Sequence, residues 1–410
     1  MMKATPKGMR DIMPEDMLIR ESVKERIIGL YRSYGYRPLD TPALEYLETL
    51  RKKAGEEADK QIFVLSDERL GLRFDLTVPL ARVAAGSDFP RPFKRYCIAP
   101  VWRKEEPQKG RFREFWQADV DIIGSSSMRC EAELLSLSKE ACTIFGFDKP
   151  KILLNNRKIL EALAEELEMG REKEEVFRIL DKIDKIGRAA VEEQLELLLG
   201  SKASDFLSYI KTTGKNKDKL DRVRDVCTEG VEELERILEM CDFDVEVNLS
   251  LVRGLGYYTG PVFEIKLSKD IGTVMAGGRY DGLLSVYGTP DPAVGISIGI
   301  ERLITLIADR EKQRKLSRTE VFIACAKPDF YPDAVNAADK LRKKGVLAET
   351  DLKGRNLRKQ FDYANSLGIR FVAIIGRREK DANKVTLRDM VSGKEEMLTL
   401  AEAAKKAREG

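Results

Sequence analysis

One segment, GRFREFWQADVDIIG at residues 110–124, alternates between two kinds of side chain. In a β-strand, successive side chains point to opposite faces, so alternate positions share a face. One set carries guanidinium, aromatic, amide and carboxylate groups, which bind phosphates, flat rings and amines. Its members are Arg111, Arg113, Phe115, Gln117, Asp119 and Asp121. The other set is largely apolar, so we predict a strand with one face toward a core and the other toward a ligand.

The preceding segment, RYCIAPVWRKEEPQKG, is predicted to be the partner of this strand. It reads as a strand that ends at Arg103, and Pro107 and Gly110 then provide a loop. The two strands are therefore expected to form an antiparallel hairpin.

The chain contains no histidine, which limits its chemistry. Catalytic triads that use histidine and HExxH zinc sites are excluded. A P-loop NTPase is not expected, because no GxxxxGK[ST] sequence occurs. Arginines, carboxylates, tyrosines, metal ions and substrate groups remain, and they suit phosphoryl or nucleotidyl transfer, where catalysis is mainly positioning and charge stabilisation.

Length and composition indicate a multidomain protein of a reducing compartment. A chain of 410 residues suggests roughly three domains. Its six cysteines have no CxxC spacing, and neither a signal peptide nor a membrane-spanning apolar run is found, so we expect a cytoplasmic protein without a membrane partner. Residues 320–410 carry 19 basic and 14 acidic side chains, which indicates either a module for an anionic partner or a solvated charged surface.

Four motifs carry a resemblance to a known family. The hairpin with Arg103, Glu105 and Phe115 resembles motif 2 of class II aminoacyl-tRNA synthetases, and GISIGIERL with Arg302 resembles their motif 3. The segments LVRGLGYYTGPVFE and AGGRYDGLL resemble peptides special to histidyl-tRNA synthetases. The resemblance covers essentially all 410 residues.

The resemblance implies an α+β class II synthetase catalytic core with an antiparallel sheet over residues 1–318, and a C-terminal α/β anticodon-binding domain over 319–410. Helical, highly charged sequence at about 155–245 reads as a helical insertion in the core. In the tail, VFIACA and FVAIIG are apolar on both faces, as in parallel strands, and a helix capped by Asn356 and stopped by Gly368 lies between them.

The N-terminal region resembles motif 1, which in this class forms the dimer interface. Apolar residues at helical spacing follow Pro14, Gly35 ends the helix, and a strand with Pro38 and Pro42 comes next. The resemblance therefore implies a homodimer, while packing of this helix and strand within one subunit is the alternative.

The implied activity is the ATP-dependent ligation of L-histidine to tRNA(His) through a histidyl-adenylate. ATP and Mg²⁺ are implied, and because Mg²⁺ is held mostly by phosphate oxygens, no cluster of protein metal ligands is expected. Arg103 and Arg253 are the implied catalytic residues, since they would stabilise charge on the attacked α-phosphate.

The resemblance also assigns the binding residues. Those for ATP are Arg103, Glu105, Arg111, Arg113, Phe115 and Arg302, with Phe115 and Arg302 on opposite faces of adenine. Those for histidine are Asp75, Thr77, Gln117, Asp121, Tyr257 and Tyr258. Asp75 is assigned to the ammonium group, with Thr77 and Gln117 beside it, and Asp121 with Tyr258 to the imidazole ring.

Three details qualify these assignments. LRFDLTVPL reads as a strand that places Arg73, Asp75 and Thr77 on one face. Many members of the family carry an acidic residue at the position of Gly256, and a glutamate at that of Asp121. With Gly256 in place of the acidic residue, a carboxylate near Arg253 is missing. Asp121, in place of a glutamate, reaches toward the ring by one methylene group less.

Two other kinds of protein fit part of the pattern. A catalytically silent paralogue that senses histidine, such as the regulatory subunit of ATP phosphoribosyltransferase, resembles only the catalytic core and lacks the tail domain. Synthetases for glycine, threonine or proline share motifs 1 to 3 and a similar tail but lack the RGLGYYTG and AGGRYDG segments.

Overall fold

The computed structural model describes residues 4–52, 59–107, 110–252, 257–268, 271–308 and 316–409, apart from the side chains of residues 184 and 185. The chain divides into two compact units. The first comprises residues 1–11 and 23–310, and the second comprises residues 12–22 and 311–410.

An eight-stranded sheet forms the centre of the first unit, in the order β1-β4-β5-β10-β9-β8-β6-β7. Only the two outer pairs, β1 with β4 and β6 with β7, are parallel among these neighbours. The strands are β1 (Arg37–Pro38), β4 (Phe93–Trp102), β5 (Glu114–Ile123), β6 (Lys151–Asn156), β7 (Glu246–Val247), β8 (Pro261–Ser268), β9 (Gly272–Arg279) and β10 (Ala293–Gly299). This arrangement confirms the predicted, largely antiparallel sheet.

The predicted hairpin is β4 paired with β5, in a register that joins Trp102 to Glu114 and Phe93 to Ile123. The regular pairing is shorter than the alternation predicted, because the chain opens into the connecting loop at Arg103. Arg111 and Arg113 therefore precede the strand, and the Arg113 carbonyl accepts a hydrogen bond from the Arg103 backbone at 2.9 Å.

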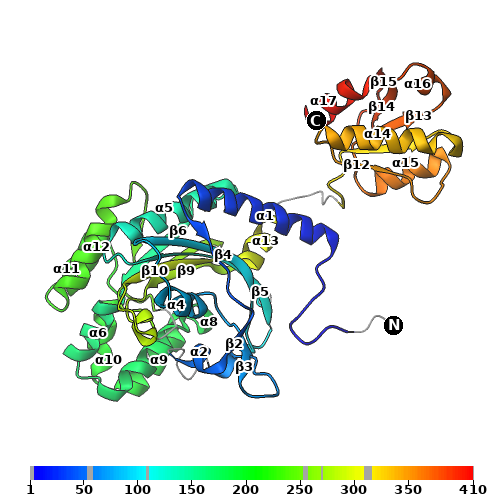
Figure 1. The fold of residues 1–410 in the computed structure, drawn as a ribbon. Helices are drawn as coiled ribbons and strands as arrows, with labels where there is room; N and C mark the ends of the chain where they lie inside the picture. The colour runs from blue at the N-terminus through cyan, green and yellow to red at the C-terminus, as the bar shows by residue number, and fades with distance from the viewer. Residues whose placement is uncertain are drawn as a thin grey trace. The chain divides into compact units, whose positions relative to one another are not determined.

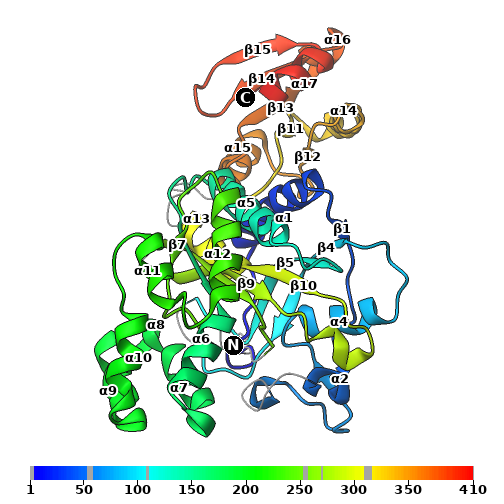
Figure 2. The ribbon, with the colours of Figure 1, turned by 90° about the vertical axis from the view of Figure 1, so that its left-hand side faces the viewer.

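Helices lie on both faces of this sheet (Figures 1 and 2). The helix α5 lies on one face, while α2 and α4 lie on the other together with the small β2–β3 sheet. The bounds are α1 (Pro14–Ser33), α2 (Leu47–Arg51), α4 (Thr77–Ala85), α5 (Arg129–Ile144), α13 (Ile300–Ala308), β2 (Leu44–Tyr46), β3 (Leu70–Leu72) and the 3₁₀ turn η2 (Leu284–Tyr287). Tyr31 of α1 donates a hydrogen bond to the Ala118 carbonyl of β5 at 3.0 Å, which ties the end of α1 to the sheet.

The strand predicted for LRFDLTVPL is wrong beyond Leu72. The strand β3 ends there, and α4 begins at Thr77. Asp75 stabilises this helix start, because its Oδ1 accepts a hydrogen bond from the Val78 backbone at 3.0 Å. Arg73 does not share a face with Asp75 and Thr77 in a strand, and its guanidinium instead binds Asp40 at 2.8 Å and the Thr41 carbonyl.

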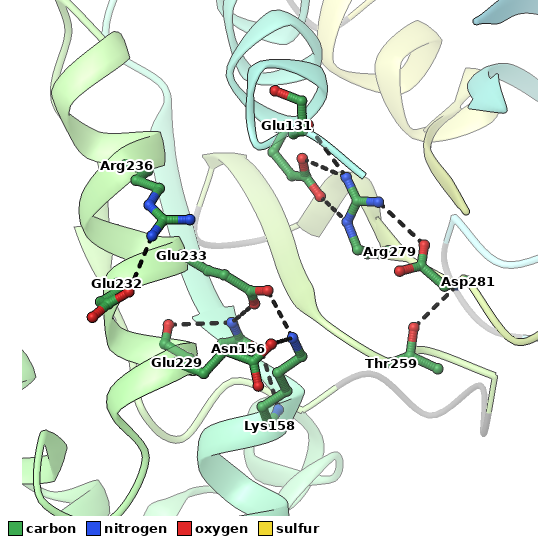
Figure 3. A network of polar contacts seen from close by, with 12 residues as sticks. Glu131, Asn156, Lys158, Glu229, Glu232, Glu233, Arg236, Thr259, Arg279 and Asp281 are labelled. Atoms are coloured by element: carbon green, nitrogen blue, oxygen red, sulfur yellow. Dashed lines mark hydrogen bonds and ion pairs between the residues drawn. The ribbon is translucent and has the colours of Figure 1, made fainter. Parts of the chain in front are cut away.

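Between β6 and β7 the chain is helical. The elements are α6 (Arg157–Glu166), η1 (Gly170–Glu172), α7 (Lys173–Leu180), α8 (Ile183–Ile186), α9 (Arg188–Leu199), α10 (Lys202–Ile210), α11 (Asn216–Val223) and α12 (Thr228–Met240). Asn156 caps α6 and donates to Glu233 of α12 at 2.7 Å, and Lys158 reaches Glu229 and Glu233, both at 2.7 Å (Figure 3). These contacts fix the first and last helices of the segment to each other where they leave the sheet.

The second unit contains a five-stranded sheet in the order β12-β11-β13-β14-β15. Its elements are β11 (Val321–Cys325), η3 (Pro328–Phe330), α14 (Tyr331–Lys343), β12 (Ala348–Thr350), α15 (Leu357–Ser366), β13 (Phe371–Ile375), α16 (Arg377–Asp381), β14 (Val385–Asp389), β15 (Glu395–Leu398) and α17 (Leu400–Glu409). The predicted parallel pairing of β11 with β13 is confirmed, and Asn356 caps α15 by accepting from the Lys359 backbone at 3.0 Å. The antiparallel strands β14 and β15 extend this α/β module.

Throughout the part of the chain that the structure describes, we find no helix with the length and apolar character that crossing a membrane requires.

Candidate active site

A cavity of about 290 Å³ opens on the first unit, lined by residues from β5, β9, β10 and the start of α4. Most of the residues predicted to bind substrates line it. These are Asp75, Thr77, Arg103, Glu105, Arg111, Phe115, Gln117, Asp121, Tyr257, Tyr258 and Arg302. Arg113 is described but is not among the lining residues, and Arg253 and Gly256 lie outside the described residues.

The side chain of Arg103 is fixed at the cavity by contacts on one side of its guanidinium. Its Nε donates to the Phe74 carbonyl at 2.9 Å, and its Cζ lies 5.1 Å from the centre of the Phe115 ring. Among the described residues, no hydrogen bond or ion pair uses its two Nη groups, so both remain for a ligand. Phe115 also packs against the apolar cluster of Leu76, Cys97 and Val101, which fixes the ring in place.

The other predicted nucleotide residues contact one another or a neighbouring strand. Arg111 pairs with Glu105 at 3.2 Å, and Arg113 donates from Nε to the Glu105 carbonyl at 3.0 Å. Arg302 reaches the Thr273 carbonyl of β9 from the first turn of α13. Glu301, beside it, accepts from the Trp116 backbone at 2.8 Å and so joins α13 to β5.

The carboxylate of Asp121 is held by two buried partners. Arg95 of β4, which is fully buried, donates to Asp121 Oδ2 at 2.8 Å, and the Tyr280 hydroxyl donates to Oδ1 at 2.6 Å. Burial raises the pKa of Asp121, and the guanidinium of Arg95 opposes that rise. Asp121 therefore lines the cavity in a fixed position, because Arg95 and Tyr280 hold its two carboxylate oxygens.

Two further buried carboxylates line the cavity, and their environments shift their titration. Burial raises the pKa of Asp75 to about 6, although the Val78 backbone and Arg103 lower it. Burial and the nearby Asp121 charge raise the pKa of Asp119 to about 7, although Ser297 and Arg95 lower it. Both groups thus titrate close to neutral pH.

The tyrosines of the cavity are positioned by a buried ion pair. Arg279, which precedes Tyr280, binds Glu131 of α5 through Nε at 2.6 Å and Nη2 at 2.9 Å, and it also binds Asp281 at 3.1 Å (Figure 3). The Asp281 backbone donates to the Thr259 hydroxyl at 3.0 Å. Since Thr259 follows Tyr257 and Tyr258, these bonds connect the two sequence segments that carry the tyrosines.

The ligand-free protein is expected to bind protons through Asp75 and Asp119 as the pH falls from about 8 to about 5. No imidazole contributes, because the chain has no histidine. The ordinary pKa of both groups is 3.8, so near pH 5 the folded state holds protons that the unfolded state has lost. Their contribution to the free energy of unfolding therefore decreases as the pH rises from about 4 to about 7.

Potentiometric difference titration checks this expectation. D119N should lose most of one titrating group near pH 7 relative to the unmodified protein. Superimposable curves for the two proteins would show that Asp119 does not titrate near pH 7.

Sequence reasoning missed several cavity features. Asp119 was noted on the ligand face but not assigned to a substrate, and Arg95 and Ser297 were not considered. Asp119 could have been found by extending the alternation argument to every carboxylate on that face. Asp181, at the end of α7, also lines the cavity, and no local signal in the helical segment indicated this.

The fold and this cavity define the catalytic core of a class II aminoacyl-tRNA synthetase. The family model for histidyl-tRNA synthetase matches residues 8–303, and that for the anticodon binding domain matches residues 320–410. The chain belongs to the histidyl-tRNA synthetase family.

Individual relatives agree with this assignment. A histidine--tRNA ligase of Aeropyrum pernix is 40% identical, over 98% of this chain and 96% of the relative. The crystal structure of histidyl-tRNA synthetase from Nostoc sp. PCC 7120 superimposes with a TM-score of 0.86 at 30% identity, covering 99% of each chain. A Bacillus halodurans structure described as an ATP phosphoribosyltransferase regulatory subunit/histidyl-tRNA synthetase shares the fold, with a TM-score of 0.77 at 24% identity over 91% of this chain and 98% of that one.

Proposed function

We propose that this protein activates L-histidine with ATP and transfers the histidyl group to tRNA(His). The observation that carries the proposal is the cavity itself, where the available guanidinium of Arg103 faces the same space as the buried carboxylates. One side of the cavity suits phosphate, and the other suits the cationic and donor groups of an amino acid.

In the first step, the carboxylate of histidine attacks the α-phosphorus of ATP and releases pyrophosphate. Negative charge develops on the α-phosphate oxygens, and Arg103 donates to them from Nη groups that bond to none of the described residues. We assign Arg253 to the same charge. In the second step, a ribose hydroxyl of the tRNA end takes the histidyl group and releases AMP.

ATP is placed by the residues at the outer part of the cavity. Phe115 offers a ring fixed by its apolar neighbours for stacking on adenine, with Arg302 on the other face. Glu105, Arg111 and Arg113 serve the base edge and the outer phosphates. Mg²⁺, bound mainly by the phosphates, would neutralise their charge, and Glu105 and Glu301 are cavity carboxylates of the kind that Mg²⁺ accepts as ligands.

Histidine is placed by the inner part. Asp75, Thr77 and Gln117 are assigned to its ammonium group, and Asp121 with Tyr258 to its ring. A carboxylate has about four lone-pair sites, so Asp121 can accept a ring N–H in addition to Arg95 and Tyr280. Tyr257, buried and 4.9 Å from Tyr258 between ring centres, forms a wall.

Amino-acid-dependent exchange of pyrophosphate into ATP, measured with each of the twenty amino acids, tests the proposal. Histidine alone should support exchange. Activity with another amino acid, or with none, would overturn the assignment.

A histidine sensor without catalysis is the second candidate, and it is favoured only by the likeness to the Bacillus halodurans fold. Against it stand Arg103 at the cavity and the match of residues 320–410 to an anticodon binding domain. The exchange assay separates the two, because a sensor would bind histidine without exchanging pyrophosphate.

We further propose that residues 1–318 perform the chemistry and that residues 319–410 bind the anticodon arm. Three exposed cations lie within seven residues, Lys353 just before α15 and Arg358 and Lys359 in its first turn. Changing all three to alanine is expected to raise KM for tRNA about tenfold or more, since each lost phosphate contact lowers affinity and its salt dependence. Histidine-dependent exchange should be unchanged.

Charging of tRNA at several salt concentrations provides the measurement. The control replaces three other exposed lysines of the same unit, Lys384, Lys394 and Lys405, with alanine. Equal effects of the two triple variants would attribute the change to net charge rather than to a binding face.

A cytoplasmic homodimer is the proposed assembly. The exposed apolar side chains of Leu44 and Tyr46, 44% and 60% accessible, support a subunit contact near the motif 1 region.

A further inference from the structure

Three buried acceptor oxygens in the cavity lack a hydrogen-bond donor among the described residues. They are Asp75 Oδ2, Gln117 Oε1 and Asp119 Oδ1, and all three side chains line the same cavity. A buried polar atom without a partner costs free energy, so such atoms are rare unless a ligand satisfies them. Three together indicate a ligand group that brings several donors.

Ser297 fixes the orientation of two of these acceptors. It lies opposite Asp119 in the pairing of β10 with β5, and its Oγ accepts a hydrogen bond from Gln117 Nε2 at 2.7 Å. Ser297 also interacts with the carboxylate of Asp119 and lowers its pKa. Because the amide nitrogen of Gln117 is used in this way, Gln117 Oε1 is left for a ligand, and Asp119 Oδ1 likewise has no hydrogen bond from a described residue.

Asp121 is not one of the three unpaired acceptors. Each of its oxygens already accepts one hydrogen bond, Oδ2 from Arg95 and Oδ1 from Tyr280. Its side chain also lies over Gly295, where a Cβ atom would come within 2.1 Å of Asp121 Oδ1. The positive charge of Arg95 already balances the negative charge of Asp121. Asp119, two residues before it on the ligand face of β5, is the neighbouring carboxylate.

We propose that Asp119 binds the α-ammonium group of the amino-acid substrate together with Asp75 and Gln117, and that Ser297 is the positioning residue for Asp119 and Gln117. An ammonium group has three N–H donors and no acceptor, which matches three unpaired acceptors. A neutral imidazole offers a single N–H and would leave two of them unpaired. The inference rests on the proposed function and adds two residues to it.

The experiment compares ligands that differ in the ammonium group. L-histidine and histidinol carry an amine and the ring, whereas 3-(imidazol-4-yl)propionate carries the ring without the amine. Their affinities are measured as inhibition or Michaelis constants in pyrophosphate exchange with the full chain. D119N should lower the affinity for histidine and for histidinol about 10- to 100-fold, and should change the affinity for the propionate less than about threefold.

Two other variants complete the set. S297A should lower the affinity for histidine by a smaller factor of about 3 to 10, since the acceptors for the ammonium group remain but are no longer oriented. D148N, an exposed site, should leave every constant unchanged. Thermal unfolding is recorded for each protein, and if D119N does not fold, the S297A comparison between histidine and the propionate decides.

The outcomes separate the inference from the proposed function. If D119N bound histidine and the propionate with equally reduced affinity, Asp119 would contact the ring. If neither affinity fell, Asp119 would not contact the substrate. Either result overturns the inference. If the unmodified chain activates a different amino acid, the proposed function fails, yet the same comparison between that amino acid and its deaminated analogue still tests Asp119.

Discussion

Replacing Arg103 with glutamine is expected to lower kcat for histidine-dependent pyrophosphate exchange by about 10²- to 10³-fold, the range found when one donor to a developing oxyanion is removed. The structure supports a large effect because the Nε bond to Phe74 fixes the guanidinium, and the Nη groups have no hydrogen bond to another described residue. Such a fixed donor needs little reorganisation as charge develops. Lysine at this position should give an intermediate rate, since it keeps the charge but not the planar pair of donors.

The test measures exchange at saturating ATP and histidine and compares it with equilibrium binding of histidine, which should change little. R236Q serves as the control, because Arg236 is 62% exposed and pairs only with Glu232 of its own helix among the described residues (Figure 3). An increase in KM for ATP with unchanged kcat would mean that Arg103 binds ground state and transition state equally.

The alternation in residues 110–124 predicted β5 and its hairpin because strand periodicity is a local property. Ala118, Val120 and Ile122 are buried on one face, while Phe115, Gln117 and Asp121 line the cavity on the other. The same reasoning predicted the parallel strands β11 and β13 from their continuous apolar runs.

Local patterns gave the wrong element where tertiary packing decided. The segment LRFDLTVPL was predicted to be a strand because Arg73, Asp75 and Thr77 alternate along it, yet the chain forms α4 from Thr77 onward. Pro79 lies in the first turn, where its missing N–H has no intrahelical partner to lose, so it does not prevent the helix. Buried Val78, Leu80 and Ala81 then pack against the core.

Arg95 shows why the fixed position of Asp121 could not be predicted. It lies in a mostly apolar run, and its partner Asp121 is 26 residues away on the neighbouring strand. Only the register of β4 with β5, which places Arg95 directly opposite Asp121, brings the two together. A buried pair of this kind depends on pairing that no single segment encodes.

Removing either member of this pair is expected to lower the free energy of unfolding of the first unit by about 3–5 kcal/mol, because the remaining charge is buried without its partner. The single variants are R95Q and D121N. Urea unfolding followed by tryptophan fluorescence suits the measurement, since the two tryptophans, Trp102 and Trp116, both lie in the β4–β5 hairpin. R236Q, which removes an exposed pair, should change stability by less than about 1 kcal/mol.

The double variant R95Q/D121N separates stability from substrate binding. Two neutral amides can bond to each other, so the double variant should be more stable than the sum of the single losses predicts, by about 1–3 kcal/mol. Histidine binding should not recover, because an amide at position 121 no longer offers a carboxylate to the ring, and KM for histidine should stay raised far more than KM for ATP. If the double variant regained histidine affinity along with stability, Asp121 would act only by supporting the sheet. The ring would then need another acceptor in the cavity.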